Sequence, residues 1–251
     1  GLNLKACSIT GGRVKIFAIA DLHLSMDRNV DKPMDIFGMG WENHALRLEE
    51  NWRNAIDDGD IVILPGDLSW GLKFEEALSD LEWIHSLSGN KVIFKGNHDL
   101  WWNGINKLNS LYEDMHFVQN EAYLANDELA ICGTRGWILP DTDEYTEQDK
   151  KIYLRELRRL ETSLKDARSK GAKEILAVMH YPPAYINNLN TEFTDLLNEF
   201  NVKTCIYGHL HGANNFRKAL TGEYNGINYK LVSLDYLGAK PKLIYDNGFV
   251  D

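Results

Sequence analysis

The chain of 251 residues contains only three cysteines, and they form no C-x-x-C pair. A disulfide framework needs paired cysteines, whereas a scattered odd number is typical of a protein in a reducing compartment. We therefore expect a cytoplasmic location. Cys205 stands inside an apolar run, so we predict that it is a small buried hydrophobic residue and not a metal ligand.

The sequence also lacks any apolar run close to the roughly 20 residues that a membrane span needs. Residues 1–12 show neither a basic segment nor a long apolar one, so we expect no secretory signal there and treat them as an extension outside the fold. No internal repeat, low-complexity tract or Pro-rich linker divides the chain. These absences predict a single domain over residues 1–251 without a membrane partner, and they leave the oligomeric state open.

Positive charge is scarce as well. The 27 Lys and Arg residues stand against 37 Asp and Glu residues, which gives a formal net charge of -10. Because the backbone of a nucleic acid is bound mainly by Lys and Arg, this balance argues against a nucleic-acid partner. An acidic protein can still bind an anionic substrate when its site holds metal cations.

Short apolar runs rich in β-branched residues predict strands at 14–20, 61–64, 91–95, 175–179 and 204–207. Amphipathic stretches predict helices between and after them, at 42–57, 74–85, 103–113, 147–170 and 191–200. Two further stretches combine strand formers with turn pairs, so we expect hairpins at 123–132 and 216–245. The pattern predicts an α/β fold, arranged as a two-sheet α/β/β/α sandwich.

Each of the five predicted strands is followed directly by polar residues that can bind a metal ion. Ligands bind beyond the carboxyl ends of the strands in open α/β sheets, so the five clusters predict one site. The donors are two carboxylates, four imidazoles and one amide: Asp21, Asp67, His23, His180, His209, His211 and Asn97. Such a set exceeds the needs of one ion and suits two if one carboxylate bridges. Nitrogen and oxygen donors without thiolate favour Mn, Fe or Zn ions, and Mg²⁺ is left open.

The order of these clusters resembles the motif series of the calcineurin-like metallophosphoesterase superfamily. The matching motifs are Asp21-x-His23, Gly66-Asp67, Gly96-Asn97-His98-Asp99, His180 and Gly208-His209-x-His211. The resemblance covers most of the chain and implies a two-metal site on an α/β/β/α sandwich. It implies that one ion is held by Asp21, His23 and His211. It assigns the other ion to Asn97, His180 and His209, with Asp67 bridging.

The resemblance also implies an activity, the hydrolysis of a small phosphomonoester or phosphodiester by a hydroxide that bridges the two ions. His98 matches the family's catalytic histidine, which contacts the phosphate and assists the leaving group. Asp99 is a second catalytic candidate, because it could orient His98; alternatively, it caps the next helix.

The sequence departs from the protein serine/threonine phosphatase branch, which carries an Arg soon after the Gly-Asp pair and a Glu at the end of the third motif. Neither feature is present here, so a bacterial-type small phosphoesterase with a small soluble substrate is the favoured interpretation. A cyclic-nucleotide or other nucleotide phosphodiesterase is the alternative. A non-catalytic binding scaffold is a remote one, because scaffolds lose ligand residues that this chain retains.

Three residues outside the motifs are candidates for substrate binding. Arg135 could clamp a phosphate or form a surface ion pair. Trp41 belongs to the connection after the first motif, residues 25–43, and His44 follows it directly. This connection exceeds the roughly 2–6 residues usual between a strand and a helix. This connection is too apolar to stay solvated, so we predict a partial lid over the metal site, with Trp41 and His44 near the leaving group. The alternative is packing against a neighbouring helix.

Overall fold

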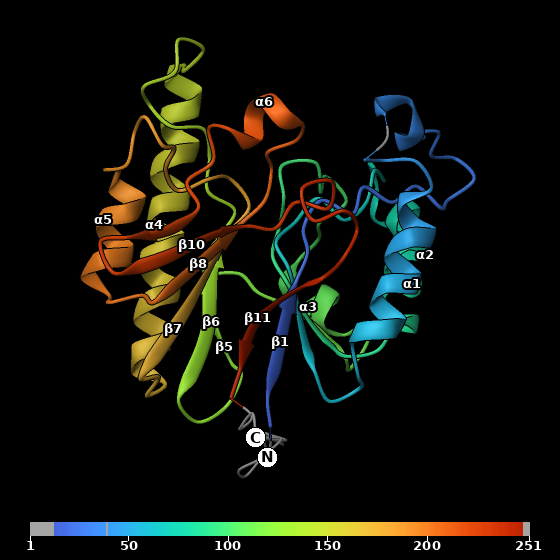
Figure 1. Ribbon diagram of the computed structural model, residues 1–251, viewed down its shortest axis with the longest axis horizontal. Coiled ribbons are helices and arrows are strands. Elements are labelled where there is room, and N and C mark those ends of the chain that lie inside the picture. Colours follow the sequence, from blue (N-terminus) through green and yellow to red (C-terminus); the bar gives the residue numbers. More distant parts are fainter. Residues whose placement is uncertain (1–12, 39, 248–251) are drawn as a thin grey trace.

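The computed structural model describes residues 13–38 and 40–247, so Cys7 and the expected extension at 1–12 lie outside the described residues. Two mixed β-sheets face each other, and helices cover the outer face of each sheet (Figure 1). This arrangement confirms the predicted α/β/β/α sandwich. The single-domain organisation stays a prediction.

The first sheet has five strands in the order β11-β1-β2-β3-β4. Strand β11 pairs antiparallel with β1, whereas the other neighbours are parallel. On the outer face lie three helices, and a short 3-10 helix, η1, stands in the connection after β1 (Figure 1). The elements are β1 (Lys15–Ala18), η1 (Met34–Phe37), α1 (His44–Ala55), β2 (Ile61–Leu64), α2 (Phe74–Ser86), β3 (Asn90–Ile93), α3 (Ile105–Asn109), β4 (Met115–Phe117) and β11 (Lys242–Asp246).

The second sheet has six strands in the order β5-β6-β7-β8-β10-β9. The β5–β6 and β9–β10 pairs are antiparallel hairpins, and the central pairs are parallel. Helices α4 and α5 lie on its outer face (Figure 1). The elements are β5 (Ala122–Leu124), β6 (Leu129–Thr134), α4 (Glu147–Ser169), β7 (Glu174–Met179), α5 (Glu192–Glu199), β8 (Thr204–Tyr207), α6 (Ala213–Phe216), β9 (Gly222–Tyr224) and β10 (Ile227–Leu231).

The core between the sheets explains why the central strands are apolar along their whole length. Ile63 of β2 and Val178 of β7 belong to one buried cluster between the sheets, while neighbouring residues of the same strands pack under the outer helices. Strands buried on both faces read as continuous apolar runs, not as alternating ones. Because these runs are unambiguous, the predicted strands at 61–64 and 204–207 match β2 and β8 residue for residue.

The predicted hairpin at 123–132 is confirmed by β5 and β6, and the one at 216–245 is wrong over much of its length. Only β9 and β10, joined at Asn225-Gly226, form a hairpin there. Phe216 ends the short helix α6, and β11 crosses to the first sheet, where it pairs with β1. Strand-forming residues do not specify which sheet edge a strand joins, so the pattern could not distinguish these outcomes.

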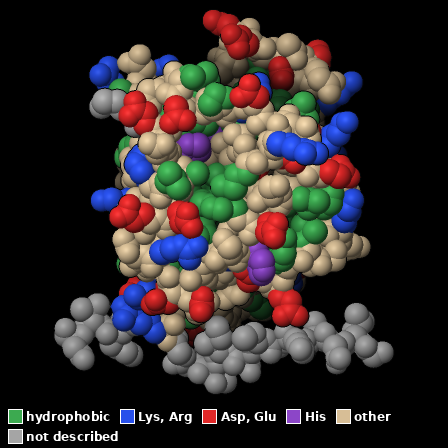
Figure 2. Space-filling model, turned by 90° about the vertical axis from the view of Figure 1, so that its right-hand side faces the viewer, with side chains coloured by type: hydrophobic (Ala, Val, Ile, Leu, Met, Phe, Trp, Pro, Cys, Tyr) green, Lys and Arg blue, Asp and Glu red, His purple; other side chains and the backbone are tan. Residues whose placement is uncertain are grey.

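The face that carries α1 and α2 has hydrophobic side chains gathered near its centre, among acidic and basic ones (Figure 2). Leu46 of α1 and Leu72 before α2 are two large hydrophobic residues that the fold leaves exposed. Among the described residues, no helix is both long enough and apolar enough to cross a membrane.

Gly133 provides a test of the β6–β7 pairing that holds the second sheet together. It lies opposite Val178, and a Cβ at this position would stand 1.7 Å from the Val178 carbonyl oxygen. No side-chain movement can relieve a clash with backbone, so Gly133→Ala should lower the free energy of unfolding by about 3 kcal/mol, measured by urea denaturation. Gly104→Ala is the control, because a Cβ there meets nothing within 4 Å. Equal losses in both variants would contradict the tight pairing.

Candidate metal centre

The polar clusters of β1, β2, β3, β7 and β8 converge at the carboxyl ends of these strands, as predicted. Backbone contacts tie them together: the N–H of Asp21 donates to the carbonyl of Gly66, and that of Gly208 donates to the carbonyl of His180. The ring of His180 binds the carbonyl of Pro65 through Nδ1, at 2.8 Å. Residues from both sheets therefore meet at one edge of the sandwich.

The backbone at this edge is strained. Asp21, His23, Asp67 and His209 all have positive φ, at 62°, 43°, 56° and 70°. Residues with a Cβ rarely adopt this conformation, which persists only where surrounding contacts hold it. The adjacent Gly96 permits one such contact, because a Cβ there would stand 2.1 Å from Oδ1 of Asp67. The strain thus falls on four of the seven predicted ligands.

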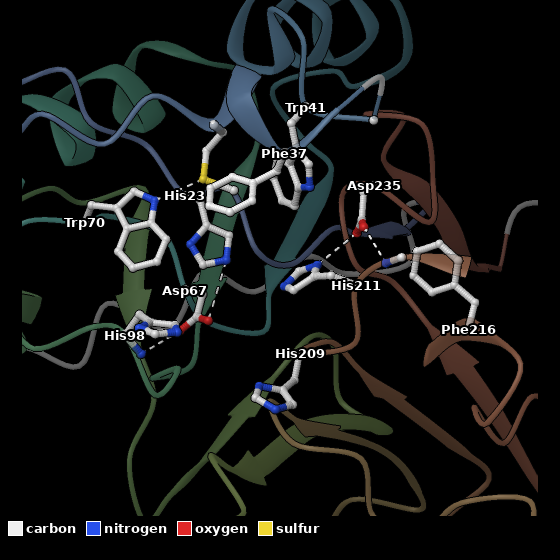
Figure 3. A pocket seen from close by; sticks show the side chains of 13 residues that line it. His23, Phe37, Trp41, Asp67, Trp70, His98, His209, His211, Phe216 and Asp235 are labelled. Atoms are coloured by element: carbon white, nitrogen blue, oxygen red, sulfur yellow. Dashed lines mark hydrogen bonds and ion pairs between the residues drawn. The ribbon is translucent and has the colours of Figure 1, made fainter. Parts of the chain in front are cut away.

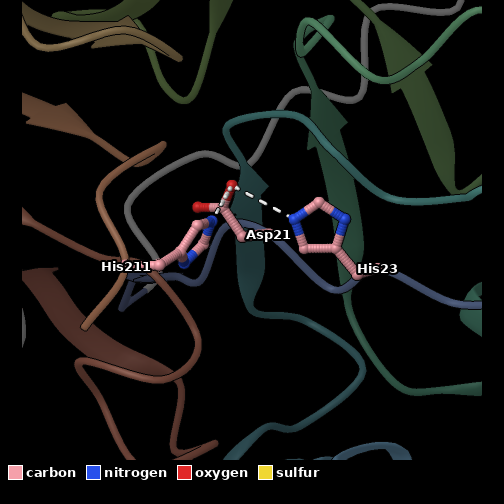
Figure 4. A group of neighbouring side chains, drawn as sticks. All are labelled: Asp21, His23 and His211. Atoms are coloured by element: carbon pink, nitrogen blue, oxygen red, sulfur yellow. Dashed lines mark ion pairs between the residues drawn. The ribbon is translucent and has the colours of Figure 1, made fainter. Parts of the chain in front are cut away.

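The first donor group consists of Asp21, His23 and His211, whose ligand atoms lie within 4.8 Å of one another. Oδ1 of Asp21 is 3.4 Å from Nε2 of His211 and 3.8 Å from Nε2 of His23 (Figure 4). This oxygen is buried and has no hydrogen-bond partner among the described residues. A buried carboxylate oxygen without a partner is costly, so the arrangement fits a cation between these three side chains.

The second donor group consists of Asp21, Asp67 and His180. Oδ2 of Asp67 is 3.2 Å from Nε2 of His180 and 3.7 Å from Nε2 of His23. Oδ1 of Asn97 also approaches Nε2 of His180, at 2.8 Å. Asp67 therefore faces predicted ligands of both ions, as a bridging carboxylate must. Since Asp21 belongs to both groups, the prediction that Asp67 alone bridges stays a prediction.

His209 belongs to neither donor group among the described residues. Its ring packs on Tyr181 with 4.1 Å between centroids, and its centroid lies 5.3 Å from that of His180. The backbone N–H of His209 donates to Oδ2 of Asp21 at 3.0 Å, so the residue helps to hold that carboxylate. Its role as a ligand stays a prediction.

Burial and charge divide the four imidazoles into two kinds. Burial lowers the pKa of His23 to about 4 and that of His209 to about 3. At His180 burial also acts to lower the pKa, but the charge of Asp67 outweighs it and raises the pKa to about 9. At His211 burial is outweighed by the neighbouring carboxylates of Asp21 and Asp235, which raise the pKa to about 10. The buried carboxylates therefore demand positive charge beside them.

A cavity of about 510 Å³ opens above these donors. Figure 3 shows the side chains that line it, which come from the connections of both sheets. His98 and Trp70 are two of them that lie next to His23 without belonging to either donor group. The ring of His98 is 5.9 Å from that of His23, and its backbone N–H donates to Oδ1 of Asp67 at 2.8 Å. His98 is thus placed beside the donors and open to the cavity.

The contacts of Asp99 within the described residues match neither of the two roles predicted for it. The next helix, α3, begins after Gly104, and the hydrogen bonds that the Asp99 carboxylate accepts there come from backbone N–H groups and an indole, not from His98. The N–H groups of Asp67 and Gly96 donate to Oδ2, both at 2.7 Å, and the N–H of Leu68 donates to Oδ1 at 2.9 Å. The N–H of Ser69 and the indole N–H of Trp101 also donate to Oδ1, at 3.5 Å and 3.0 Å. Asp99 therefore ties the second motif to the third, because both strand-end loops converge on its carboxylate.

Two of the three predicted substrate-binding residues do not line the cavity. Arg135 pairs with the buried Glu156 at 3.2 Å and stacks on Trp137, so its guanidinium is engaged away from the donors. An ion pair was the alternative role predicted for Arg135, but the prediction placed it at the surface, whereas Glu156 is buried. His44 is buried and binds the carbonyl of Leu22 at 2.7 Å, so it lies behind Trp41 and not beside a substrate.

The connection at 25–43 contributes described residues to the lining of the cavity, and its role as a partial lid stays a prediction. Met34, Phe37, Gly40 and Trp41 line the cavity (Figure 3). The ring of Trp41 packs edge-on against His211 and His23, with centroids 5.4 Å and 5.6 Å away. Trp70 helps to hold the connection in place, because its indole N–H donates a hydrogen bond to the sulfur of Met34 at 3.3 Å. An effect of this lid on selectivity stays a prediction.

Asp235 is a site residue that the sequence pattern does not reveal. Its Oδ1 binds Nδ1 of His211 at 2.9 Å, and its Oδ2 accepts from the backbone of Gly212 at 3.1 Å. Carboxylates that bind the far nitrogen of a ligating histidine fix its tautomer and orientation. Asp235 follows β10 and therefore stands after a sixth strand. The sequence of this segment has the pattern of a long hairpin, so the pattern does not indicate a site residue there.

The family model described as calcineurin-like phosphoesterase matches residues 14–213. No curated protein matches the chain in sequence. Among solved structures, TT1561 of Thermus thermophilus has a TM-score of 0.51 and 13% identity, over 91% of this chain and 97% of that one. The protein of unknown function AQ665 from Aquifex aeolicus has a TM-score of 0.49 and 13% identity, over 92% and 95% of the chains. At 13% identity, the likeness to TT1561 shows a similar fold alone.

The role of Asp99 can be tested by Asp99→Asn, which keeps the size of the side chain. In asparagine an NH₂ group replaces one carboxylate oxygen. This group donates hydrogen bonds, so it cannot accept them from the N–H groups that face it. Because the loop of Asp67 loses its anchor, metal affinity should fall about 10- to 100-fold, measured by calorimetric titration with Mn²⁺. Trp101→Phe removes one donor and leaves the backbone contacts, so it should cost less. Unchanged affinity in Asp99→Asn would show that the loop is held by other contacts.

Proposed function

Because the chain belongs to the calcineurin-like phosphoesterase family, we propose that it hydrolyses a small phosphomonoester or phosphodiester with two divalent metal ions bound at the candidate centre. The placement of Asp67 carries this proposal, since Oδ2 faces His180 at 3.2 Å and His23 at 3.7 Å. A carboxylate that faces ligands of both ions is what a two-metal site requires. The buried, unpartnered Oδ1 of Asp21 supports it as a second oxygen suited to a cation.

In this proposal each ion is held from one side of the centre. One is bound by Asp21, His23 and His211, the other by Asn97, His180 and His209, and Asp67 bridges them. When bound, the ions lower the pKa of a water molecule and neutralise charge on the phosphoryl oxygens. Mn, Fe and Zn ions suit these nitrogen and oxygen donors best.

The residues around the ions orient the ligands and the substrate. Asp235 holds His211 through Nδ1, and Asp99 holds the loops of the second and third motifs. His98 faces the cavity, so we assign it the transfer of a proton to the departing ester oxygen. Trp41 and Trp70 pack against the ring of His23 and help to bury it.

Metal dependence is the first test of the proposal. Treatment with a chelator should abolish hydrolysis of aryl phosphate mono- and diesters, and Mn²⁺, Fe²⁺, Zn²⁺ or Mg²⁺ should restore it. The same panel includes cyclic nucleotides and phosphoproteins, which separate the alternatives. Asp67→Asn should reduce the amount of bound metal more than the substitution of any other single ligand, because the Asp67 carboxylate serves both ions. Asp60→Asn, at the opposite end of β2, is the control and should retain its metal.

The role assigned to His98 makes a second test. His98→Ala should leave metal content near that of the wild type and lower kcat by roughly 10²–10⁴, the range for a lost general acid. The deficit should shrink for nitrophenyl esters, whose leaving group needs little protonation. His85→Ala removes an exposed histidine that lies far from the donors, at the end of α2, and serves as the control. An equal loss for good and poor leaving groups would exclude the acid role.

A further inference from the structure

The cavity above the centre has apolar walls on two sides of the donor histidines. On the side of His23 lie Trp70 and Phe37, and beyond His211 lies Phe216 of α6 (Figure 3). Met34 also lines the cavity and accepts a hydrogen bond from Trp70. These walls come from different parts of the fold, the first from connections of the first sheet and the second from the segment after β8. A phosphoryl group at the centre would therefore have an apolar surface on either side.

Apart from its histidines, the described lining of the cavity has no basic side chain. None of the described residues that line it is Lys or Arg, and Asp235 adds a carboxylate. Lys32 approaches Trp70, with Nζ 5.9 Å from the ring centroid, but does not line the cavity. Phosphate groups with about 1.5 to 2 negative charges are commonly met by Arg or Lys in addition to metal. A phosphate group with a single negative charge needs fewer such basic side chains.

The size of the cavity points to organic groups beyond the phosphate. Its volume of about 510 Å³ lies within the range of small-molecule sites and far exceeds one phosphate. Phe37 is 66% exposed, although it is a large hydrophobic residue beside a cavity. An apolar ester group packed against it would cover surface that the folded chain leaves in water.

We propose that the substrate is a phosphodiester with one negative charge, whose ester groups lie on the Phe37 and Phe216 sides of the centre, at least one of them aromatic or otherwise apolar. This inference rests on the proposed function, because the phosphoryl group is taken to bind at the metal centre. A diester places one organic group on each wall, whereas a monoester leaves one wall uncovered.

Diphenylphosphinate and dimethylphosphinate test the walls without any turnover. Both are monoanions that carry two groups on phosphorus through C–P bonds, so the protein cannot hydrolyse them. In calorimetric titrations of the metal-loaded protein, diphenylphosphinate should bind at least about tenfold more tightly, because its rings bury apolar surface. Equal affinities for the two compounds would overturn the inference.

Two variants locate the contacts on each wall. Phe37→Ala and Phe216→Ala should each weaken diphenylphosphinate binding by about 3- to 10-fold and leave dimethylphosphinate binding unchanged. Ile36→Ala is the matched control, since Ile36 precedes Phe37, is 74% exposed and does not line the cavity. Metal content and thermal unfolding of every variant are measured in parallel, so a folding defect is recognised. Loss of affinity for both phosphinates at unchanged metal content would count against the two walls.

Hydrolysis tests the preference for one negative charge. Diphenyl phosphate and phenyl phosphate release the same phenol, and we expect the higher kcat/KM for the diester. If phenyl phosphate were preferred and Lys32→Ala removed that preference, Lys32 would supply the second positive charge and the inference would be overturned.

Different results would contradict the proposed function and the inference about the two walls. Hydrolysis of phosphoesters together with phosphinate affinities that ignore Phe37 and Phe216 would overturn the inference and leave the proposed function in place. No hydrolysis under any metal, together with diphenylphosphinate binding that depends on both residues, would overturn the proposed function and support the two walls.

Discussion

Two carboxylates, Asp21 and Asp67, lie almost fully buried, and the site is organised around the cost of keeping them there. An ionised carboxylate out of water is tolerated only when positive charge or several donors face it. Here imidazoles supply part of that charge, and the pKa values of His180 and His211 rise above their usual range as a result. Metal ions between the same side chains would replace protons with a larger positive charge.

The burial of these carboxylates determines the shape of the surrounding loops. Asp21 and Asp67 are buried on backbone with positive φ, which favours glycine and costs free energy for other residues. Hydrogen bonds offset this cost: Asp99 collects the N–H groups around Asp67, and the N–H of His209 binds Asp21. Residues that look catalytic from their position in a motif can therefore act by holding the backbone.

The same distinction explains how far the sequence predicts this molecule. The buried strands and their polar ends were predictable, because continuous apolar runs followed by Asp, His or Asn are local signals. The roles of Asp99, Arg135 and His44 were not, because each depends on a partner distant in sequence, such as Glu156 for Arg135. Asp235 was missed for a related reason: its contact with His211 exists only after β10 pairs with β8. Local pattern predicts where donors gather, and tertiary pairing decides what each one touches.

The division between centre and walls follows from the topology. Donor residues sit on short loops directly after central strands, where strain and hydrogen bonds leave little freedom to change. Met34 and Phe37 stand on a long connection, and Phe216 stands on a four-residue helix after β8, so both walls lie outside the sheets. Insertions or substitutions there are tolerated more readily than changes at strand ends. An acidic chain can thus keep one cationic centre for anionic substrates while the walls alone change which organic groups it accepts.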